Sequence, residues 1–421
     1  MNEAFINYLW HNSLLRAPLV TTQGQPIYVI NPGELNADAG PDFANARIKI
    51  GEEIWAGNVE IHVRASDWYK HNHADTEDYK TIILHVVHDC DVPDNALGQF
   101  PTMEIKNCYD PQLYFKYEAF MYAKTWVPCA ASFSISSDIA RLSMAEKCIY
   151  ERIDRKASEI EKLMVFTVNN QEETFYMLLA RCFGLKVNSQ AFEMLARSIP
   201  LTILLKHRDQ LNQLEALLFG QSGLLADDAR DEYEYELKRE YLFLRKKYNL
   251  VPIPSHVWKF MRLMPASFPT IRIAQFANLL HGSSHVLARV LACDTAEAII
   301  EVLQCIASPY WDTHYQFGIP SQRSVKKPSN DFYNLLIINA IVPYLFLQGK
   351  VFDNHEHKEK AIGLLEQIAP ENNALTRGWS SLGLEFKDAF NSQAFNELKT
   401  KYCNQKRCLE CRIGHNILGK D

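Results

Sequence analysis

The sequence contains no apolar run of the roughly 20 residues that a bilayer-spanning helix needs. Its longest apolar run, at 332–347, is shorter and includes Asn339 and Pro343. We therefore expect a buried core helix that is kinked at the proline. The first 15 residues lack the basic start and long apolar stretch of a signal peptide, and their pattern predicts a short amphipathic helix. We expect a cytoplasmic protein with no membrane partner.

The sequence also lacks a net excess of positive charge. The chain has 44 Lys and Arg residues against 50 Asp and Glu residues, which gives a formal net charge of −6. This balance argues against a surface that binds nucleic acid or anionic membranes through its overall charge. Any contact with phosphate must therefore be local.

Three common catalytic motifs are missing from the sequence: the G-x-S-x-G nucleophile turn, the Walker A phosphate loop and the G-x-G-x-x-G dinucleotide loop. Each of these motifs has a physical role in binding phosphate or exposing a nucleophile. Serine hydrolase chemistry, nucleotide hydrolysis by the P-loop route and dinucleotide binding therefore lose support.

The pattern of the chain changes twice along its 421 residues. Short β-branched or alternating segments bounded by Gly, Pro, Asn or Asp dominate residues 1–125. Helical patterns follow one another over 138–400 with no fixed repeat period, and 401–421 carry a Cys/His motif. We predict an α+β protein with an N-terminal mixed β-sheet domain, a large all-α domain and a C-terminal Cys/His knuckle.

Two of the predicted strands differ in character. Side chains alternate between the two faces of a strand. In NVEIHV at 58–63, one face carries Val59, Ile61 and Val63, and the other carries Asn58, Glu60 and His62. We expect the first face to be core and the second to be polar. TIILHVV at 81–87 is almost continuously apolar, which predicts a central strand covered on both faces.

Acidic and histidine side chains are dense between residues 34 and 91. The set comprises Glu34, Asp38, Asp42, Glu60, His62, Asp67, His71, His73, Asp75, Asp78, His85, His88, Asp89 and Asp91. Burying a carboxylate is costly unless it is paired, hydrogen-bonded or bound to a metal, so acids on strands need a partner. Carboxylates suit Mg²⁺ or Mn²⁺ and imidazoles suit Zn²⁺, Mn²⁺ or iron, so the mixture permits either class of ion.

The segment around Asp42 and Glu60 resembles the PD-(D/E)xK nuclease superfamily. In that superfamily an Asp at the start of one strand and a Glu on the adjacent strand bind the metal, and a lysine two residues after the Glu positions the water. Here Pro41-Asp42 supplies the first element and Glu60-Ile61-His62 the second, with histidine in place of lysine. The resemblance implies a restriction-endonuclease-like sheet and Mg²⁺ or Mn²⁺ at Asp42, Glu60 and His62. Histidine is itself a metal ligand and titrates near neutral pH, so it cannot copy an ammonium group.

Each residue of this group also has a purely structural interpretation. Asp42 follows Gly40-Pro41 and would cap its own turn. Glu60 and His62 would lie on the solvent-facing edge of an antiparallel sheet. His85, within an apolar strand, is typical of a buried histidine with a satisfied hydrogen bond.

Two further groups in this region remain open. A literal E-x-K sequence, Glu104-Ile105-Lys106, follows Asp89 and Asp91 but ends the β-rich region, which is typical of an exposed last strand. The second group contains His71 and His73, which would either join Asp75 or His85 at a metal ion or lie in an exposed polar loop.

The C-terminal segment places Cys403, Cys408, Cys411 and His415 in a C-x4-C-x2-C-x3-H pattern. The C-x2-C pair lets two thiolates bind one tetrahedral ion, and the outer Cys and His would complete a structural Zn²⁺ site. Alternatively, the three cysteines and a distant fourth, such as Cys129, would hold an iron–sulfur cluster. Some nucleases of the resembled superfamily carry such a cluster. The remaining interpretation is a tail with reduced thiols.

The stretch MRLMPASFPTIRIAQFANLLH at 261–281 allows two interpretations. Arg262, Arg272 and Gln275, with the neighbouring phenylalanines, would contact nucleic acid. The simpler interpretation is a packed helix that begins at a proline and buries its apolar stripe.

Taken as a whole, the chain resembles an uncharacterised bacterial domain-of-unknown-function family, number 2851. The segments ELNADAGPDFANARI, ILHVV, FPTIRIAQFANLL and CLECRIGH carry this resemblance. It implies a bacterial cytoplasmic protein and no established activity.

Two functional hypotheses follow from the residues. The first is a divalent-metal-dependent nuclease-like protein that cleaves nucleic-acid phosphodiesters, with Asp42, Glu60 and His62 as catalytic residues. The second is a non-catalytic scaffold that binds nucleic acid or protein and contains a structural metal knuckle. An isomerase or hydrolase that uses the histidines on a small substrate is a third possibility.

Overall fold

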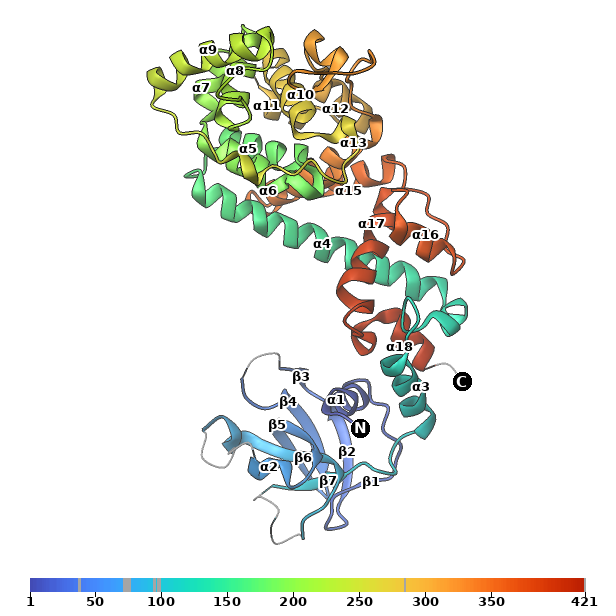
Figure 1. The fold of residues 1–421 in the computed structure, drawn as a ribbon. Helices are drawn as coiled ribbons and strands as arrows, with labels where there is room; N and C mark the ends of the chain where they lie inside the picture. The colour runs from blue at the N-terminus through green and yellow to red at the C-terminus, as the bar shows by residue number, and fades with distance from the viewer. Residues whose placement is uncertain (37–38, 71–76, 94–95, 97–99, 284, 420–421) are drawn as a thin grey trace. The chain divides into compact units, whose positions relative to one another are not determined.

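A computed structural model describes residues 1–36, 39–70, 77–93, 96, 100–283 and 285–419 (Figure 1). The chain forms two compact units. The first comprises Met1–Met144, Ser381–Gly383 and Leu398–Asp421, and the second comprises Ala145–Ser380 and Leu384–Glu397. The predicted α+β class, with an N-terminal sheet and a large helical region, is confirmed.

A mixed sheet of seven strands forms the core of the first unit. The strands are β1 (Leu19–Val20), β2 (Pro26–Asn31), β3 (Glu34–Leu35), β4 (Phe43–Ile50), β5 (Glu53–Arg64), β6 (Ile82–Asp89) and β7 (Thr102–Glu104). Their order is β1-β2-β4-β5-β6-β7, with β3 paired to β4 (Figure 1). Pairs up to β4–β5 are antiparallel, whereas β5–β6 and β6–β7 are parallel. A parallel pair needs a crossover, and the crossover from β5 to β6 contains α2 (Asp67–Lys70) and η2 (Glu77–Thr81).

Strand β5 lies in the middle of the sheet, between β4 and β6. Val59 and Ile61 are buried, as predicted for the core face, but Glu60 and His62 are buried as well. The interpretation of Glu60 and His62 as a solvent-facing edge is therefore wrong, because a neighbouring strand pairs with β5 on each side. Strand β6 is a central strand with a continuously buried start, which confirms its prediction.

Helix α1 (Glu3–His11) contacts β5 and is amphipathic, as the sequence predicts. The side chain of Asn2 accepts a hydrogen bond from the Phe5 amide and so caps the helix. Its buried residues include the pairs Phe5/Leu9 and Ile6/Trp10, and the two members of each pair lie about one turn apart. This stripe holds α1 against the sheet.

The rest of the first unit is helical and comes from both ends of the chain. It contains α3 (Pro111–Tyr122), η4 (Ala130–Ile135), the start of α4 (Asp138–Phe166), η9 (Leu398–Cys403), η10 (Cys408–Glu410) and α18 (Arg412–Leu418). Helix α18 contacts both η4 and α3. The C-terminal cysteines thus belong to the same compact unit as the sheet.

The second unit consists mainly of packed helices. Its elements after α4 are α5 (Gln171–Phe183), α6 (Leu185–Ser198), α7 (Leu201–Lys206), α8 (Leu211–Gln221), α9 (Glu232–Tyr248), η5 (Ser255–Val257), η6 (Pro265–Ser267), α10 (Pro269–Gly282), α11 (Val286–Leu291), α12 (Ala296–Leu303), η7 (Pro309–Thr313), β8 (His314–Gln316), β9 (Ile319–Pro320), α13 (Asn330–Leu336), η8 (Ile337–Ile341), α14 (Val342–Val351), α15 (His355–Gln367), α16 (Ala374–Ser380) and α17 (Ala389–Glu397). Side chains of Asn170, Asp231 and Thr295 cap the starts of α5, α9 and α12.

The apolar stretch around Pro343 forms the continuous helical segment Asn330–Val351. Within the described residues it is the one helix long and apolar enough to cross a membrane, and 83% of its apolar window is buried inside the protein. The predicted core helix is confirmed. The π-turn η8 ends two residues before Pro343, and the Val342 amide donates to the carbonyl of Ile337. This shift accommodates a proline, which lacks an amide hydrogen.

Helix α10 settles the two interpretations of residues 261–281. Both Arg272 and Gln275 are buried, and the Arg272 guanidinium lies 3.7 Å from the ring centre of Phe332. Arg272 Nη1 donates to Gln275 Oε1 at 3.0 Å. The packed helix that begins at Pro269 is therefore confirmed, and these two side chains are used inside the protein.

Candidate functional site

The structure brings Asp42 and Glu60 together from adjacent strands. Asp42 directly precedes β4, where Phe43 pairs with Val59 of β5. The Asp42 amide donates to Glu60 Oε2 at 3.1 Å, and the Ile61 amide donates to Asp42 Oδ2 at 2.9 Å. Each carboxylate is thus held by a backbone amide on the other's strand. The interpretation of Asp42 as a cap of its own turn is wrong, because its carboxylate bonds across to β5.

This arrangement raises the pKa of both acids. Burial raises the pKa of Asp42, although the bonds from Ile61 and Asn7 act in the opposite direction. The pKa of Glu60 rises to about 8, first through burial and then through the negative charges of Asp42 and Glu3. Two carboxylates this close resist double ionisation, so the pair retains a proton at neutral pH unless a cation neutralises it.

His62 faces the carboxylate pair from the same strand as Glu60. Its Nε2 lies 3.7 Å from Glu60 Oε1, and its Nδ1 lies 2.9 Å from Nε2 of His85 on β6. If His62 Nδ1 carries the proton of this bond, its Nε2 presents a lone pair toward Glu60. His85 is buried, and Trp68 and Phe100 pack around its ring. The interpretation of His85 as a buried, hydrogen-bonded histidine is confirmed.

Asn7 of α1 is a site residue that the sequence interpretation missed. Its Nδ2 donates to Asp42 Oδ1 at 3.4 Å, while its Oδ1 is buried with no hydrogen-bond partner among the described residues. A buried acceptor without a donor is unusual in a folded protein. The sequence feature that could have identified Asn7 is its position as a polar residue beside the buried stripe of an amphipathic helix.

The second E-x-K candidate has a different environment. Lys106 Nζ lies 2.7 Å from Asp89 Oδ1, and both side chains are more than one third exposed. Glu104 is exposed on β7, the last strand in the sheet order. The interpretation as an exposed last strand is confirmed. Asp38, His71, His73 and Asp75 lie outside the described residues.

A second group forms where the C-terminal segment meets residues 128–129. Cys129, Cys403, Cys408 and Cys411 line one cavity of about 20 Å³. The pKa of Cys408 rises to about 12, through burial and then through the thiolates of Cys129 and Cys411. Cys129, which the sequence suggested as a distant fourth cysteine, therefore lies beside the three C-terminal cysteines. It places His415 elsewhere, with Nδ1 3.0 Å from the Tyr8 hydroxyl of α1.

Neither group stands in coordination geometry. In the part of the chain that the structure describes, no three His, Cys, Asp or Glu side chains are placed to hold a metal ion as they stand. Side-chain rotation would be needed at either group before an ion could be bound.

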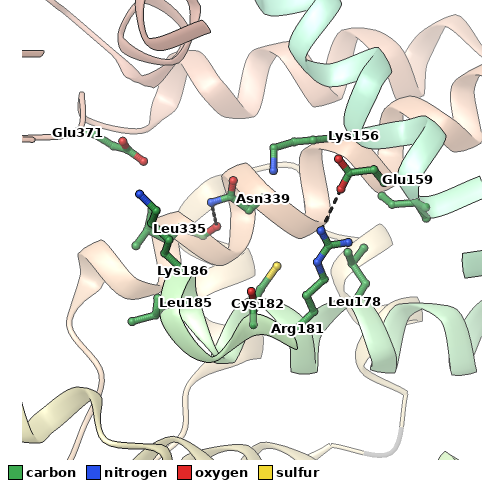
Figure 2. A pocket seen from close by; sticks show the side chains of 12 residues that line it. Lys156, Glu159, Leu178, Arg181, Cys182, Leu185, Lys186, Leu335, Asn339 and Glu371 are labelled. Carbon is green, nitrogen blue, oxygen red and sulfur yellow. Dashed lines mark hydrogen bonds and ion pairs between the residues drawn. The ribbon is translucent and has the colours of Figure 1, made fainter. Parts of the chain in front are cut away.

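A separate pocket of about 540 Å³ lies in the second unit (Figure 2). Lys156, Arg181 and Lys186 line it together with Glu159 and Glu371, and Arg181 Nη2 lies 3.1 Å from Glu159 Oε2. Burial lowers the pKa of Lys156 to about 8. Charges of both signs share this pocket, so its lining selects no single ligand charge.

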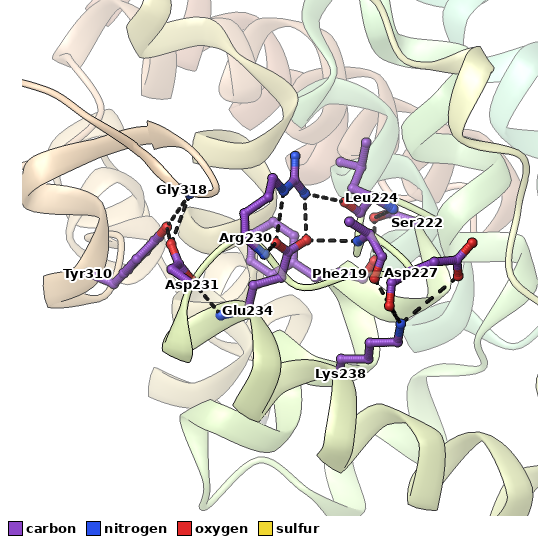
Figure 3. A network of polar contacts seen from close by, with 11 residues as sticks. Phe219, Ser222, Leu224, Asp227, Arg230, Asp231, Glu234, Lys238, Tyr310 and Gly318 are labelled. Carbon is purple, nitrogen blue, oxygen red and sulfur yellow. Dashed lines mark hydrogen bonds and ion pairs between the residues drawn. The ribbon is translucent and has the colours of Figure 1, made fainter.

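The first turn of α9 contains a buried acid of another kind, Glu234, which bonds back to the preceding loop (Figure 3). Glu234 accepts from the amides of Ala226 and Arg230, each at 2.8 Å. The Arg230 guanidinium donates to both of its oxygens, at 2.5 and 2.8 Å. These bonds hold the pKa of Glu234 below its usual value despite burial. Glu234 is saturated with donors and organises the loop.

Comparison with protein families shows which family the chain matches. Residues 3–374 match the family described as "Protein of unknown function (DUF2851)". The chain belongs to this family. The matched range contains the carboxylate pair and ends before the three C-terminal cysteines. Comparisons with curated proteins and with solved structures find no match.

Proposed function

We propose that the first unit is a divalent-metal-dependent phosphodiesterase that cleaves nucleic acid, with Mg²⁺ or Mn²⁺ at Asp42 and Glu60. One observation carries this proposal: a half-buried carboxylate, Asp42, and a buried one, Glu60, are joined by reciprocal bonds to backbone amides, and both have raised pKa values. Such a pair is poorly stabilised on its own and favours a cation.

The position of the pair supports a restriction-endonuclease-like sheet. Asp42 stands at the start of β4, Glu60 lies on the adjacent β5, and His62 follows two residues later. This order resembles the PD-(D/E)xK pattern, with histidine in the lysine position. Strand alternation puts Glu60 and His62 on the same face.

The donor set also fits such an ion. Backbone amides hold Asp42 Oδ2 and Glu60 Oε2. Asp42 Oδ1 and Glu60 Oε1 are then the oxygens that would turn to the ion. Carboxylate oxygens with an imidazole nitrogen nearby suit Mn²⁺ particularly well. When bound, the ion would polarise the phosphoryl oxygen and offset the charge that develops during cleavage.

The protein's own side chains would handle the water and its proton. His62 Nε2 would accept the proton of the attacking water, since the contact to His85 orients its ring. The buried Oδ1 of Asn7, beside Asp42, would accept a hydrogen bond from the same or a neighbouring water. Burial of His62 and His85 against Trp68 keeps bulk water from the ring pair.

The test uses the purified full chain with labelled single- and double-stranded DNA and RNA, in Mg²⁺ or Mn²⁺. We expect metal-dependent cleavage that Asp42→Asn and Glu60→Gln each reduce at least about 100-fold. Both variants keep an oxygen that can accept the backbone bonds, so the fold is preserved. Glu104→Gln, on the same sheet but away from the pair, is the matched control and should cleave as the wild type does.

Two results would overturn the proposal: a wild-type protein that cuts none of the four substrates in either metal, or a Glu60→Gln variant that cuts normally. In the first case, wild-type binding of the uncut substrates would favour the non-catalytic scaffold.

A further inference from the structure

The four cysteines of the small cavity come from separate places in the first unit. Cys129 directly precedes η4, and Cys403 ends η9. Cys408 begins η10, and Cys411 directly precedes α18. All four are reduced, because no cysteine of the chain forms a disulfide. Four thiols from four helix ends around one cavity are a donor set typical of a structural tetrahedral ion.

We propose that Cys129, Cys403, Cys408 and Cys411 together bind one Zn²⁺ ion, and that His415 is not one of its ligands. The spacing of the C-terminal motif makes His415 the natural fourth ligand, but His415 does not line the cavity and its ring lies against Tyr8. Cys129 instead lines the cavity with the three C-terminal cysteines. This site is independent of the carboxylate pair and of the function proposed for it.

The size of the cavity favours a single ion. Its volume of about 20 Å³ is close to the space that one water-sized sphere occupies. An iron–sulfur cluster contains several iron and sulfide atoms and would need a larger space between the four thiols than a single Zn²⁺ ion does.

The backbone around the cavity is already closely fitted. A Cβ atom at Gly414 would overlap the carbonyl oxygen of Cys408, so only glycine lets α18 approach η10 this closely. This approach brings the segments of Cys408 and Cys411 together. Because no three donors yet stand around a common point, binding requires rotation of cysteine side chains about χ1, between staggered positions.

The zinc ion would join the C-terminal segment to η4 and so fix α18. Through the contact between His415 and Tyr8, α18 is in turn linked to α1. Removal of the ion should therefore loosen α18 first and α1 second, whereas the central strands of the sheet should keep their protection. Hydrogen exchange of the full chain measures this order directly.

The test begins with the reduced, metal-free full chain, to which ZnCl2 is added. We expect one Zn²⁺ per chain, and Cys129→Ser should weaken zinc binding on the order of 100-fold. Two variants serve as controls. His415→Asn should bind zinc as the wild type does, and so should Cys293→Ser, whose thiol lies in the second unit and bonds to the carbonyl of Arg289.

A second measurement on the wild type covers the case in which Cys129→Ser does not fold. Alkylation followed by mass spectrometry should show that Zn²⁺ protects Cys129, Cys403, Cys408 and Cys411 together. Loss of zinc in His415→Asn but not in Cys129→Ser would overturn the proposal. Iron with acid-labile sulfide in the purified protein would also overturn it, as would zinc that leaves Cys129 reactive.

Discussion

Two buried glutamates in this protein have opposite surroundings. Glu234 in the second unit receives two backbone amides and both arms of Arg230, and its pKa is lowered. Glu60 in the first unit lies against a second carboxylate and a histidine, and its pKa rises to about 8. Burial alone therefore does not decide the role of an acid.

The difference lies in which charges and donors compensate the carboxylate. At Glu234 the protein supplies a cation and enough hydrogen bonds, so the ionised form is stable and the group holds a loop in place. At Glu60 burial and the negative charges of Asp42 and Glu3 raise the pKa, so the ionised form is disfavoured and a bound cation would stabilise it. The comparison separates a structural acid from a candidate metal ligand.

The largest expected effect is a separation of activity from stability. Glu60→Gln should reduce metal-dependent cleavage at least about 100-fold and leave the thermal unfolding temperature unchanged or higher, because it removes one of two repelling acids. Glu234→Gln should cleave normally at temperatures where it is folded. Cleavage rates and thermal unfolding curves of both variants measure this separation. Normal cleavage by Glu60→Gln together with lost cleavage by folded Glu234→Gln would contradict the assignment of roles to the two acids.

The next effect concerns stability alone. Glu234→Gln should lower the free energy of unfolding by about 2 kcal/mol, because Arg230 loses its ion partner while some hydrogen bonds persist. The partial exposure of Arg230 limits this loss. Urea unfolding measures it, with the exposed Glu236→Gln as control. An unchanged midpoint would show that this network is not structural.

A smaller effect is the pH dependence of metal binding at the carboxylate pair. The pKa of Glu60 in the folded, metal-free protein is above its ordinary value, so this site binds an extra proton between pH 4.5 and about 8. Mn²⁺ must displace that proton, so its apparent affinity should rise by about tenfold per pH unit from pH 6 toward pH 8. Titration calorimetry measures this slope, and a flat profile would contradict the raised pKa.

The smallest effect concerns Lys156 in the pocket of the second unit. Its pKa of about 8 in the folded protein is below its ordinary value, so the charged form is disfavoured by folding. Lys156→Met should raise the free energy of unfolding at pH 7 by on the order of 1 kcal/mol. The gain should shrink as the pH rises from 8 toward 10.5, where the wild-type lysine loses its proton in both states. Lys186→Met, at an exposed position of the same pocket, should change stability little.

The local patterns of the sequence predicted many elements of the fold. Alternation in NVEIHV placed Val59 and Ile61 in the core, and the apolar run at 81–87 gave a central strand. These local patterns failed where the neighbouring strand or residue comes from a distant part of the sequence. Glu60 and His62 were open to an edge interpretation because nothing local shows that β6 pairs in parallel beside β5.

The candidate sites show the same division. The spacing of Asp42, Glu60 and His62 indicated a metal site, but Asn7 enters it from a helix 35 residues away from Asp42. The sequence left both His415 and a distant cysteine such as Cys129 open as the fourth member of the C-terminal group, whereas the structure places Cys129 in the cavity and pairs His415 with Tyr8. Spacing within a motif is a local property, and the partner of a side chain across the fold is not.

The sequence by itself determined which segments tend to form strands or helices, the net charge of the chain and which side chains are able to bind a metal. Propensity, periodicity and side-chain chemistry are properties of short stretches, so they can be read without the fold. Only the tertiary structure decided which acids lie together, which are neutralised, and which thiols share a cavity. Burial and the proximity of distant charges set those outcomes, and both depend on the packing of the whole unit.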